Sequence, residues 1–159
     1  MPKLDAARAP VKAGSIYPAP YDARMAGRSS IRLGQAGGLT QFGVNLVTLE
    51  PGARSSLRHW HVAEDEFVMV TEGVLVLLDD EGAHPMGPGD CAAFPAGDGN
   101  GHCLENRGDA VARFLVVGGR AARETVTYSD VDLKLDIENG RAAFTRKDGR
   151  PYEREENDG

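Results

Sequence analysis

The feature that most constrains the fold of this chain is the regular interruption of its apolar segments. From residue 41 onward, short apolar or β-branched runs alternate with clusters of glycine, proline, aspartate and asparagine. The 159 residues include 20 glycines and nine prolines, a composition that favours tight turns. No stretch of about 12 residues keeps a helical period with capping residues. The pattern predicts an all-β fold, an antiparallel sandwich or barrel with turns about every 8–12 residues.

The apolar runs between these turns give the expected strands. They comprise one short strand near residues 30–33 and further strands at 42–49, 57–61, 66–71, 74–78, 91–94, 102–105 and 112–117. Residues 126–135 alternate weakly between apolar and polar side chains. Asn139-Gly140 is typical of a hairpin turn, with residues 142–145 as the return strand.

Changes in residue composition along the chain predict three regions built around one core. Residues 1–38 are expected to form an N-terminal arm, residues 39–119 the core of the barrel, and residues 120–159 a C-terminal extension. The extension is expected to pack on the barrel and to end in a frayed, charged tail. A chain of 159 residues supports one well-packed domain better than two.

Charge and hydropathy exclude several classes of partner. The formal net charge of −6 and the isoelectric point of about 5.2 oppose binding to a nucleic-acid backbone. The longest apolar runs are strand-sized and too short to span a bilayer. The N-terminus has no apolar signal segment, so we expect a cytoplasmic protein without membrane contact. Cys91 and Cys103 are accordingly expected to be reduced thiols.

A cluster of imidazole and carboxylate side chains carries the candidate chemistry. His59 and His61 stand two positions apart, so on a strand both rings lie on one face and Trp60 lies on the other. Glu66 follows after a short turn and can fold back beside the two imidazoles. His102 opens a later strand after a glycine-rich loop and can supply a fourth ligand.

These ligand types predict a site for one divalent transition metal. Neutral imidazole nitrogens with a carboxylate suit Zn, Fe, Mn, Ni, Co or Cu and leave coordination positions open for water or substrate. An isolated His-x-His pair is a weak signal, since two strand histidines are common on protein surfaces. His84 lies past a polar hairpin tip, and we expect it to be solvated.

Two sets of fixed positions resemble the motifs of the cupin superfamily. The first motif is a glycine, His-x-His, four residues, Glu, six residues and a glycine, matched by Gly52, His59, His61, Glu66 and Gly73. The second is matched by Gly89, Pro95, Gly97, His102 and Asn106. Together they cover about a third of the chain.

Two spacings depart from the cupin pattern. Six residues separate Gly52 from His59 where the pattern has five, and four separate Gly97 from His102 where it usually has two. Both insertions fall in turns, which tolerate added length. The second lengthens the approach to His102 and makes it the ligand most in need of structural support.

The resemblance implies a double-stranded β-helix, or jelly-roll, barrel whose metal is held by His59, His61, Glu66 and His102. The overall build resembles stand-alone bacterial cupins described as sugar-phosphate isomerases. It implies a metalloenzyme that acts on a small polar metabolite by Lewis-acid chemistry, and a homodimer. A metal-dependent dioxygenase and a non-catalytic small-molecule binding or sensing cupin are the alternatives, because this fold serves many functions. The sequence identifies no general base.

Three arginines are candidates for gripping an anionic substrate group at the mouth of the barrel. Arg54, Arg58 and Arg113 flank the motif strands. A guanidinium group binds carboxylate and phosphate oxygens in pairs. We therefore predict that these three side chains bind the substrate.

Overall fold

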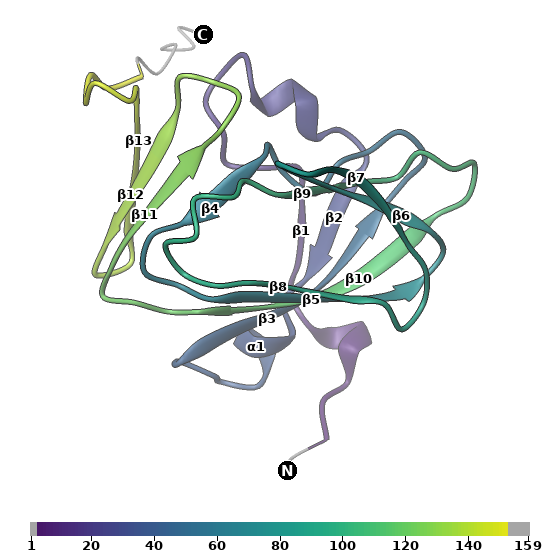
Figure 1. Ribbon diagram of the computed structural model, residues 1–159. Helices are drawn as coiled ribbons and strands as arrows, with labels where there is room; N and C mark the ends of the chain where they lie inside the picture. Colours follow the sequence, from purple (N-terminus) through teal and green to yellow (C-terminus); the bar gives the residue numbers. More distant parts are fainter. Residues whose placement is uncertain (1–2, 153–159) are drawn as a thin grey trace, which may run out of the picture.

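The computed structural model describes residues 3–152, which are almost entirely β-structure (Figure 1). The strands are β1 (Val11–Ala13), β2 (Arg28–Ile31), β3 (Phe42–Leu49), β4 (His59–His61), β5 (Glu66–Glu72), β6 (Leu75–Asp79), β7 (Gly82–Met86), β8 (Cys91–Phe94), β9 (Cys103–Glu105), β10 (Ala112–Gly119), β11 (Arg123–Tyr128), β12 (Lys134–Glu138) and β13 (Arg141–Thr145). Helical structure in this range is limited to α1 (Leu33–Ala36) and the 3-10 turns η1 (Ala6–Arg8) and η2 (Asp22–Met25). The all-β prediction is confirmed.

The largest layer is a six-stranded antiparallel sheet with the order β1-β2-β3-β10-β5-β8. Phe114 of β10 pairs with Val47 of β3 on one side and with Val70 of β5 on the other. All three side chains are buried. Alternation along each strand therefore turns one apolar face of this sheet inward.

The opposing layer consists of two smaller sheets, β7-β6-β9 and β13-β12-β11-β4. Isolated antiparallel bridges connect them, between Arg54 and Glu105 and between His59 and His102. The two layers enclose a common interior (Figure 1). This arrangement is the jelly-roll barrel that the resemblance to cupins implied.

Two clusters of buried side chains fill the interior. The first lies inside the barrel and consists of Val47, Leu49, Ala53, Val68, Val70, Leu75, Leu77, Met86, Leu104, Ala112 and Phe114. The second joins the arm, the end of the barrel and the C-terminal strands, and consists of Met25, Leu57, Val126, Tyr128, Leu133 and Leu135. The second cluster therefore provides an apolar contact that holds the N-terminal and C-terminal segments against the end of the barrel.

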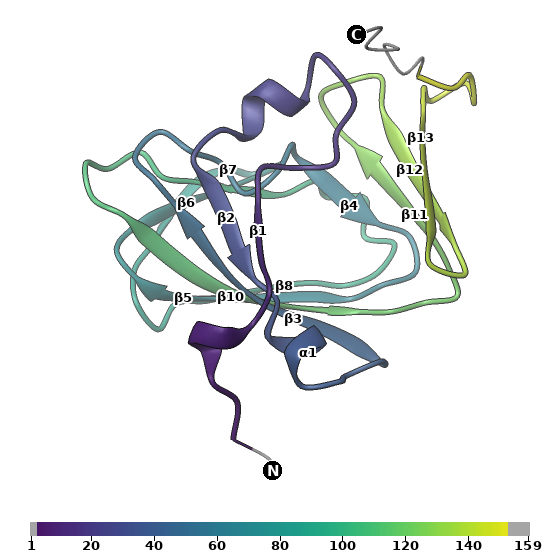
Figure 2. The same ribbon diagram turned by 180° about the vertical axis from the view of Figure 1, so that it is seen from behind.

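The N-terminal segment adds two strands to the main sheet. β1 pairs with β2, and β2 pairs with β3 (Figure 2). Between these strands the chain places Tyr17 edge-on against Tyr128 and Phe144, with ring centroids 5.4 and 5.8 Å apart. This segment thus contacts the C-terminal strands at the open end of the barrel.

The C-terminal strands are joined to the barrel through β4. In the β11–β4 pair, Val126 lies opposite His61 and Tyr128 opposite His59. Asn139, at a positive φ of 49°, begins the β12–β13 turn with Gly140, as its sequence predicted. The strand that carries two predicted ligands is therefore held by residues more than 60 positions later in the chain.

Several strand boundaries differ from the sequence-based expectation. Residues 126–135 form the end of β11, a turn and the start of β12 rather than one strand. β7 was not predicted, because Pro85 lacks a backbone N–H and discourages a strand assignment. β7 lies at the edge of its sheet, where a proline is tolerated. Residues 33–36 form α1, so the arm strand ends at Ile31.

Gly73 shows why the first motif ends on a glycine. This residue turns β5 into β6 at a φ of +73°, a conformation that disfavours side chains. A Cβ at this position would lie 2.8 Å from the carbonyl oxygen of Val111. Both the backbone conformation and the close approach of the β10 side of the barrel therefore require glycine here.

Within residues 3–152, none of the helices combines the length and the apolar character needed to cross a membrane. The same residues hold Cys91 exposed and Cys103 buried, each as a free thiol.

Candidate metal centre

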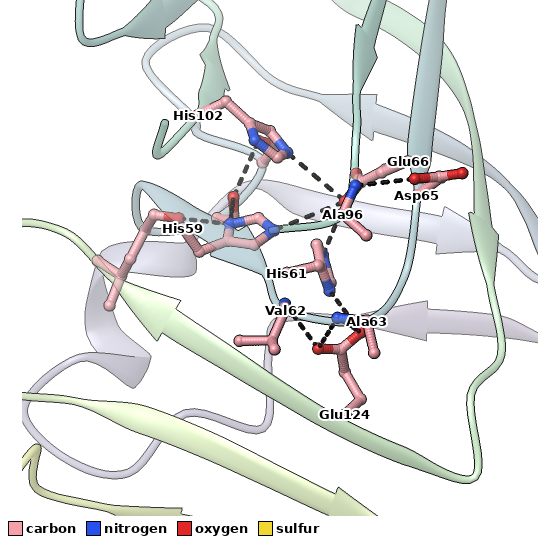
Figure 3. Close-up of polar contacts among 12 residues, drawn as sticks. His59, His61, Val62, Ala63, Asp65, Glu66, Ala96, His102 and Glu124 are labelled. Atoms are coloured by element: carbon pink, nitrogen blue, oxygen red, sulfur yellow. Dashed lines mark hydrogen bonds and ion pairs between the residues drawn. The ribbon is translucent and has the colours of Figure 1, made fainter. Parts of the chain in front are cut away.

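Three of the four predicted metal ligands, all histidines, converge on one carboxylate oxygen of the remaining ligand, Glu66 (Figure 3). The Nε2 atoms of His59, His61 and His102 lie 3.7, 2.9 and 3.5 Å from Oε2 of Glu66. Donor atoms of His59, His61 and Glu66 all lie within 4.8 Å of one another. The fourth residue, His102, is outside that group of three but points at the same oxygen. The side chains are between 4% and 18% exposed.

Strand geometry brings these side chains together. β4 places His59 and His61 on one face, and Glu66 opens β5 immediately after the intervening turn. The backbone N–H of His59 donates to the His102 carbonyl at 3.1 Å, and the N–H of His102 donates to the His59 carbonyl at 2.9 Å. This reciprocal pair fixes His102 opposite His59, although 42 positions separate them in the sequence.

The longer loop before His102 is absorbed without displacing the histidine. Gly97 adopts a φ of +74° and donates its N–H to the carbonyl of His61 at 2.7 Å. Further along, the side chain of Asn100 accepts a hydrogen bond from the backbone N–H of Asp80 at 2.9 Å. The loop is thus tied at two points, and the additional residues lie between Gly97 and His102.

A hydrogen bond to the far ring nitrogen of His59 favours ligation through its Nε2. Nδ1 of His59 lies 2.9 Å from the Leu57 carbonyl oxygen, a pure acceptor that requires a proton on Nδ1. Nε2 of His59 is then unprotonated and available to a metal. The ring of His102 stacks on Phe94, with centroids 3.5 Å apart and planes at 3°. Stacking fixes the orientation of this fourth ring.

The electrostatics of the cluster match a cation-binding site. Burial works to raise the pKa of Glu66, but contacts with the three histidines outweigh it and hold the pKa well below its usual range. Burial lowers the pKa of His102. Burial also works to lower the pKa of His61, but the contact with Glu66 and the negative charges of Glu124 and Glu64 together raise it. Glu66 is therefore an anion, and His102 favours the neutral form that ligates metals.

The residues present fit a divalent transition metal. Three imidazole nitrogens and one carboxylate form a donor set that such ions accept. Nε2 of His102 is buried and has no hydrogen-bond partner among residues 3–152. A buried unpaired ring nitrogen is costly, and a cation bound beside Glu66 would satisfy it. The chain therefore contains a His/Glu group suited to binding a metal.

Glu124 is a buried carboxylate behind the ligand His61. Its side chain has no exposed surface, and its Oε2 lies 3.8 Å from Nδ1 of His61 (Figure 3). Its Oε1 accepts hydrogen bonds from the backbone N–H groups of Val62, Ala63 and Thr125 at 2.9, 3.1 and 2.7 Å. The sequence did not point to Glu124, because it lies in β11, far from either motif.

A cavity of about 550 Å³ opens beside the ligands. Its lining includes His59, Glu66 and His102 together with residues from the N-terminal segment, the main sheet and the C-terminal strands. A volume of this order holds a small metabolite. Glu64 lines the same cavity, and its Oε1 accepts a hydrogen bond from the N–H of Ala121 at 2.7 Å.

All three predicted substrate-binding arginines form ion pairs with carboxylates of the chain. Arg54 forms a hydrogen-bonded ion pair with Glu105. A terminal nitrogen of Arg58 lies 2.6 Å from Oδ1 of Asp80. Neither arginine lines the cavity beside the ligands. Their guanidinium groups are already engaged by carboxylates of the chain.

The third predicted arginine is likewise paired, and other cationic residues line the cavity instead. A terminal nitrogen of Arg113 lies 2.5 Å from Oε2 of Glu72 on a neighbouring strand. Lys12, Arg28 and Arg120 are the basic residues of the cavity lining. Lys12 and Arg28 belong to the segment that the sequence described only as an arm with one short strand. No local sequence signal pointed to them, because the pairing of β1 with β2 that places them together is set by the fold.

Comparison with known proteins places the chain in a family. Residues 45–118 match the model of the cupin domain. The chain is 63% identical to a protein of known crystal structure from Silicibacter pomeroyi, described as a sugar phosphate isomerase of the cupin superfamily. That match covers 96% of this chain and 97% of the other, with a TM-score of 0.93. No curated protein matches the chain in sequence.

Two further solved structures extend the comparison. A protein from Acidithiobacillus ferrooxidans, provisionally named a sugar phosphate isomerase, is 31% identical over 80% of this chain and 81% of its own, with a TM-score of 0.71. The polyketide cyclase RemF from Streptomyces resistomycificus shares the fold at 20% identity and a TM-score of 0.62, over 75% of this chain and 79% of its own. From its motifs, its jelly-roll barrel and these matches, the chain belongs to the cupin superfamily.

Proposed function

We propose that this cupin binds one divalent transition metal through His59, His61, Glu66 and His102 and acts as a sugar-phosphate isomerase. The observation that carries the proposal is the convergence of three Nε2 atoms on one Glu66 oxygen at the wall of a metabolite-sized cavity. The similarity to the two proteins described as sugar phosphate isomerases supports the substrate class. When bound, a divalent ion supplies Lewis-acid polarisation of a carbonyl or hydroxyl oxygen.

Glu64 is our candidate for proton transfer in this reaction. An isomerisation between an aldose and a ketose moves a proton between adjacent carbons, so it requires a group that accepts and returns it. Among the described residues, Glu64 is the acidic side chain that lines the cavity outside the ligand set. Burial raises the pKa of its carboxyl group, and the hydrogen bond from Ala121 occupies Oε1. Oε2 is left to exchange the proton.

Elemental analysis of the purified protein tests the metal assignment. We expect about one equivalent of Zn, Fe, Mn, Ni, Co or Cu in the wild type. His61→Ala removes a ligand and should abolish stoichiometric binding while the barrel stays folded. The matched control is His84→Ala, since His84 is 43% exposed and pairs with Asp79 away from the cluster. Full occupancy in His61→Ala would remove His61 from the site.

Turnover of sugar phosphates tests the reaction itself. The metal-loaded wild type should interconvert an aldose phosphate and its ketose, and Glu64→Gln should lower kcat at unchanged metal content, by about 10²–10⁴-fold. Activity with a redox-inert ion such as Zn would exclude a dioxygenase. A metal-loaded wild type that binds sugar phosphates without converting them would overturn the isomerase assignment in favour of a binding protein.

A further inference from the structure

Arg28 directs a partly free guanidinium group into the wall of the cavity. Nε of Arg28 donates to the Ser55 carbonyl at 2.6 Å, and one terminal nitrogen donates to the Gly14 carbonyl at 3.4 Å. A guanidinium group has five N–H donors, so most of the terminal donors of Arg28 have no partner among residues 3–152. The side chain is half-buried and lines the same cavity as the metal ligands.

The local strand pairing explains this position. Lys12 lies opposite Ser30 in the β1–β2 pair, and the N–H of Gly14 donates to the Arg28 carbonyl at 3.0 Å. Lys12 and Arg28 are therefore diagonal neighbours on one face of the hairpin. Gly14 has no side chain to cover the Arg28 guanidinium. Both cationic side chains line the cavity.

Among residues 3–152, neither Lys12 nor Arg28 forms an ion pair with a carboxylate. The contacts of the Arg28 guanidinium go to uncharged carbonyl oxygens. Burial, followed by the charges of Arg32 and Arg28, lowers the pKa of Lys12. Although Glu64 and Glu66 also line the cavity, neither is ion-paired with these two cations, in contrast to the carboxylates that pair with Arg54 and Arg113.

We propose that Arg28 and Lys12 form the phosphate-binding subsite of this cavity. The inference rests on the proposed function, because it gives the substrate two anchors, a phosphate group at the arm and an oxygen at the metal ligands. Two positive charges match a phosphate monoester dianion. The unused N–H donors of Arg28 suit its oxygens, since charge-assisted hydrogen bonds from guanidinium to phosphate are strong and directional.

Ser55 and Ser56 connect this subsite to the metal centre. Ser55 accepts the Nε–H of Arg28 through its carbonyl, and Oγ of Ser56 lies 3.2 Å from Nδ1 of His59. The two anchors are thus positioned by adjacent residues of one loop. A substrate held at both is fixed in orientation as well as place, which is the requirement for proton transfer at a defined carbon.

Calorimetric titration of inorganic phosphate into the purified, metal-containing protein tests the subsite. At constant ionic strength and near-neutral pH, the wild type should bind one equivalent. Arg28→Met should lower the phosphate affinity by at least about tenfold and Lys12→Met by about threefold, because each removes a charged partner. Arg8→Met is the matched control, since Arg8 lies in the same N-terminal segment with its side chain 89% exposed. It should bind phosphate like the wild type.

A conservative substitution and the metal content of each variant distinguish the loss of a binding subsite from a folding defect. Arg28→Lys keeps the charge and should recover part of the affinity, and all variants should retain the wild-type metal content by elemental analysis. Equal phosphate affinity in the wild type and Arg28→Met, at equal metal content, would overturn the inference by placing the anion elsewhere. Malonate binding that depends on Arg28, without phosphate binding, would overturn phosphate in favour of a dicarboxylate.

The subsite and the proposed function can fail separately. If phosphate binds through Arg28 but the protein carries no metal and takes none up, the subsite stands and the metalloenzyme assignment falls. If the metal is present and phosphate does not bind the wild type, the subsite is wrong and the metal centre is unaffected.

Discussion

Glu124 illustrates how a residue outside the predicted ligand set can orient a predicted ligand. Its buried carboxylate faces Nδ1 of His61 at 3.8 Å. The negative charge favours the tautomer with a proton on Nδ1, which leaves Nε2 unprotonated toward Glu66. The three backbone N–H groups that bind Oε1 hold the carboxylate in this orientation.

Replacing Glu124 by glutamine should weaken metal binding. The amide removes the charge behind His61 and can present an N–H₂ group to Nδ1, which favours the tautomer protonated on Nε2 and blocks ligation. We expect Glu124→Gln to lower metal affinity by about 10–100-fold in chelator competition. Glu138→Gln is the control, because Glu138 pairs with Arg123 at the surface. Equal affinities of both variants and the wild type would contradict a role for Glu124 in positioning His61.

The two cysteines should differ in reactivity because of their surroundings. Cys103 is 2% exposed, and burial raises the pKa of its thiol to about 11. Since the thiolate is the reactive form and a raised pKa depletes it at lower pH, alkylation of Cys103 should be slow near neutrality and rise about tenfold per pH unit up to about pH 11. Peptide mapping after iodoacetamide treatment should find Cys91 labelled first.

Unfolding provides the contrast for this experiment. In denaturant both thiols should react at similar rates, since burial no longer distinguishes them. Equal labelling of Cys91 and Cys103 in the native protein would show that the interior around β9 is open to reagent.

At the scale of elements, β4 depends on strands that come much later in the chain. β4 has only three residues and lies in the sheet β13-β12-β11-β4. Its position is fixed by β11 on one side and by the bridge to His102 on the other. The C-terminal strands therefore help to hold the candidate metal ligands in place.

Truncation of Leu133 should destabilise the whole molecule in one step. Leu133 is fully buried in the cluster that joins the arm, Leu57 and the C-terminal strands. We expect Leu133→Ala to lower the free energy of unfolding by about 2–5 kcal/mol in urea titration. The fluorescence of Trp60, the single tryptophan and a residue of β4, should report the same transition as circular dichroism.

The control for this variant is Leu39→Ala, because Leu39 is 42% exposed. Its change in unfolding free energy should stay within about 0.5 kcal/mol. A separate early transition in Leu133→Ala, with Trp60 fluorescence unchanged, would show that the C-terminal strands unfold independently of the barrel.

At the scale of the whole molecule, the cavity exists only because three distant segments meet. Lys12 and Arg28 come from the N-terminal segment, Glu66 and His102 from the barrel, and Tyr128 from the C-terminal strands. Figures 1 and 2 show these segments together at one end of the barrel. The cupin barrel thus provides the ligands, while the segments before and after it complete the cavity walls.

The sequence alone determined the all-β fold class, and it predicted which side chains form the candidate ligand cluster. Turn residues and two-residue alternation are local signals, and they placed β3 and β8 at their observed bounds. The spacing of His59, His61 and Glu66 is also local, since one strand and one turn bring them together. His102 was predicted as a fourth ligand because it opens a strand after the glycine-rich loop, and its approach to Glu66 is seen in the structure.

Only the tertiary structure decided which charged side chains face the cavity. Arg54, Arg58 and Arg113 were chosen for their nearness to the motifs in sequence, yet carboxylates from other strands engage them. Arg28 and Glu124 lie far from the motifs and reach the cavity or the ligands through strand pairing. A charge is paired or free according to its neighbours in space, and those neighbours are set by long-range register, which no local pattern records.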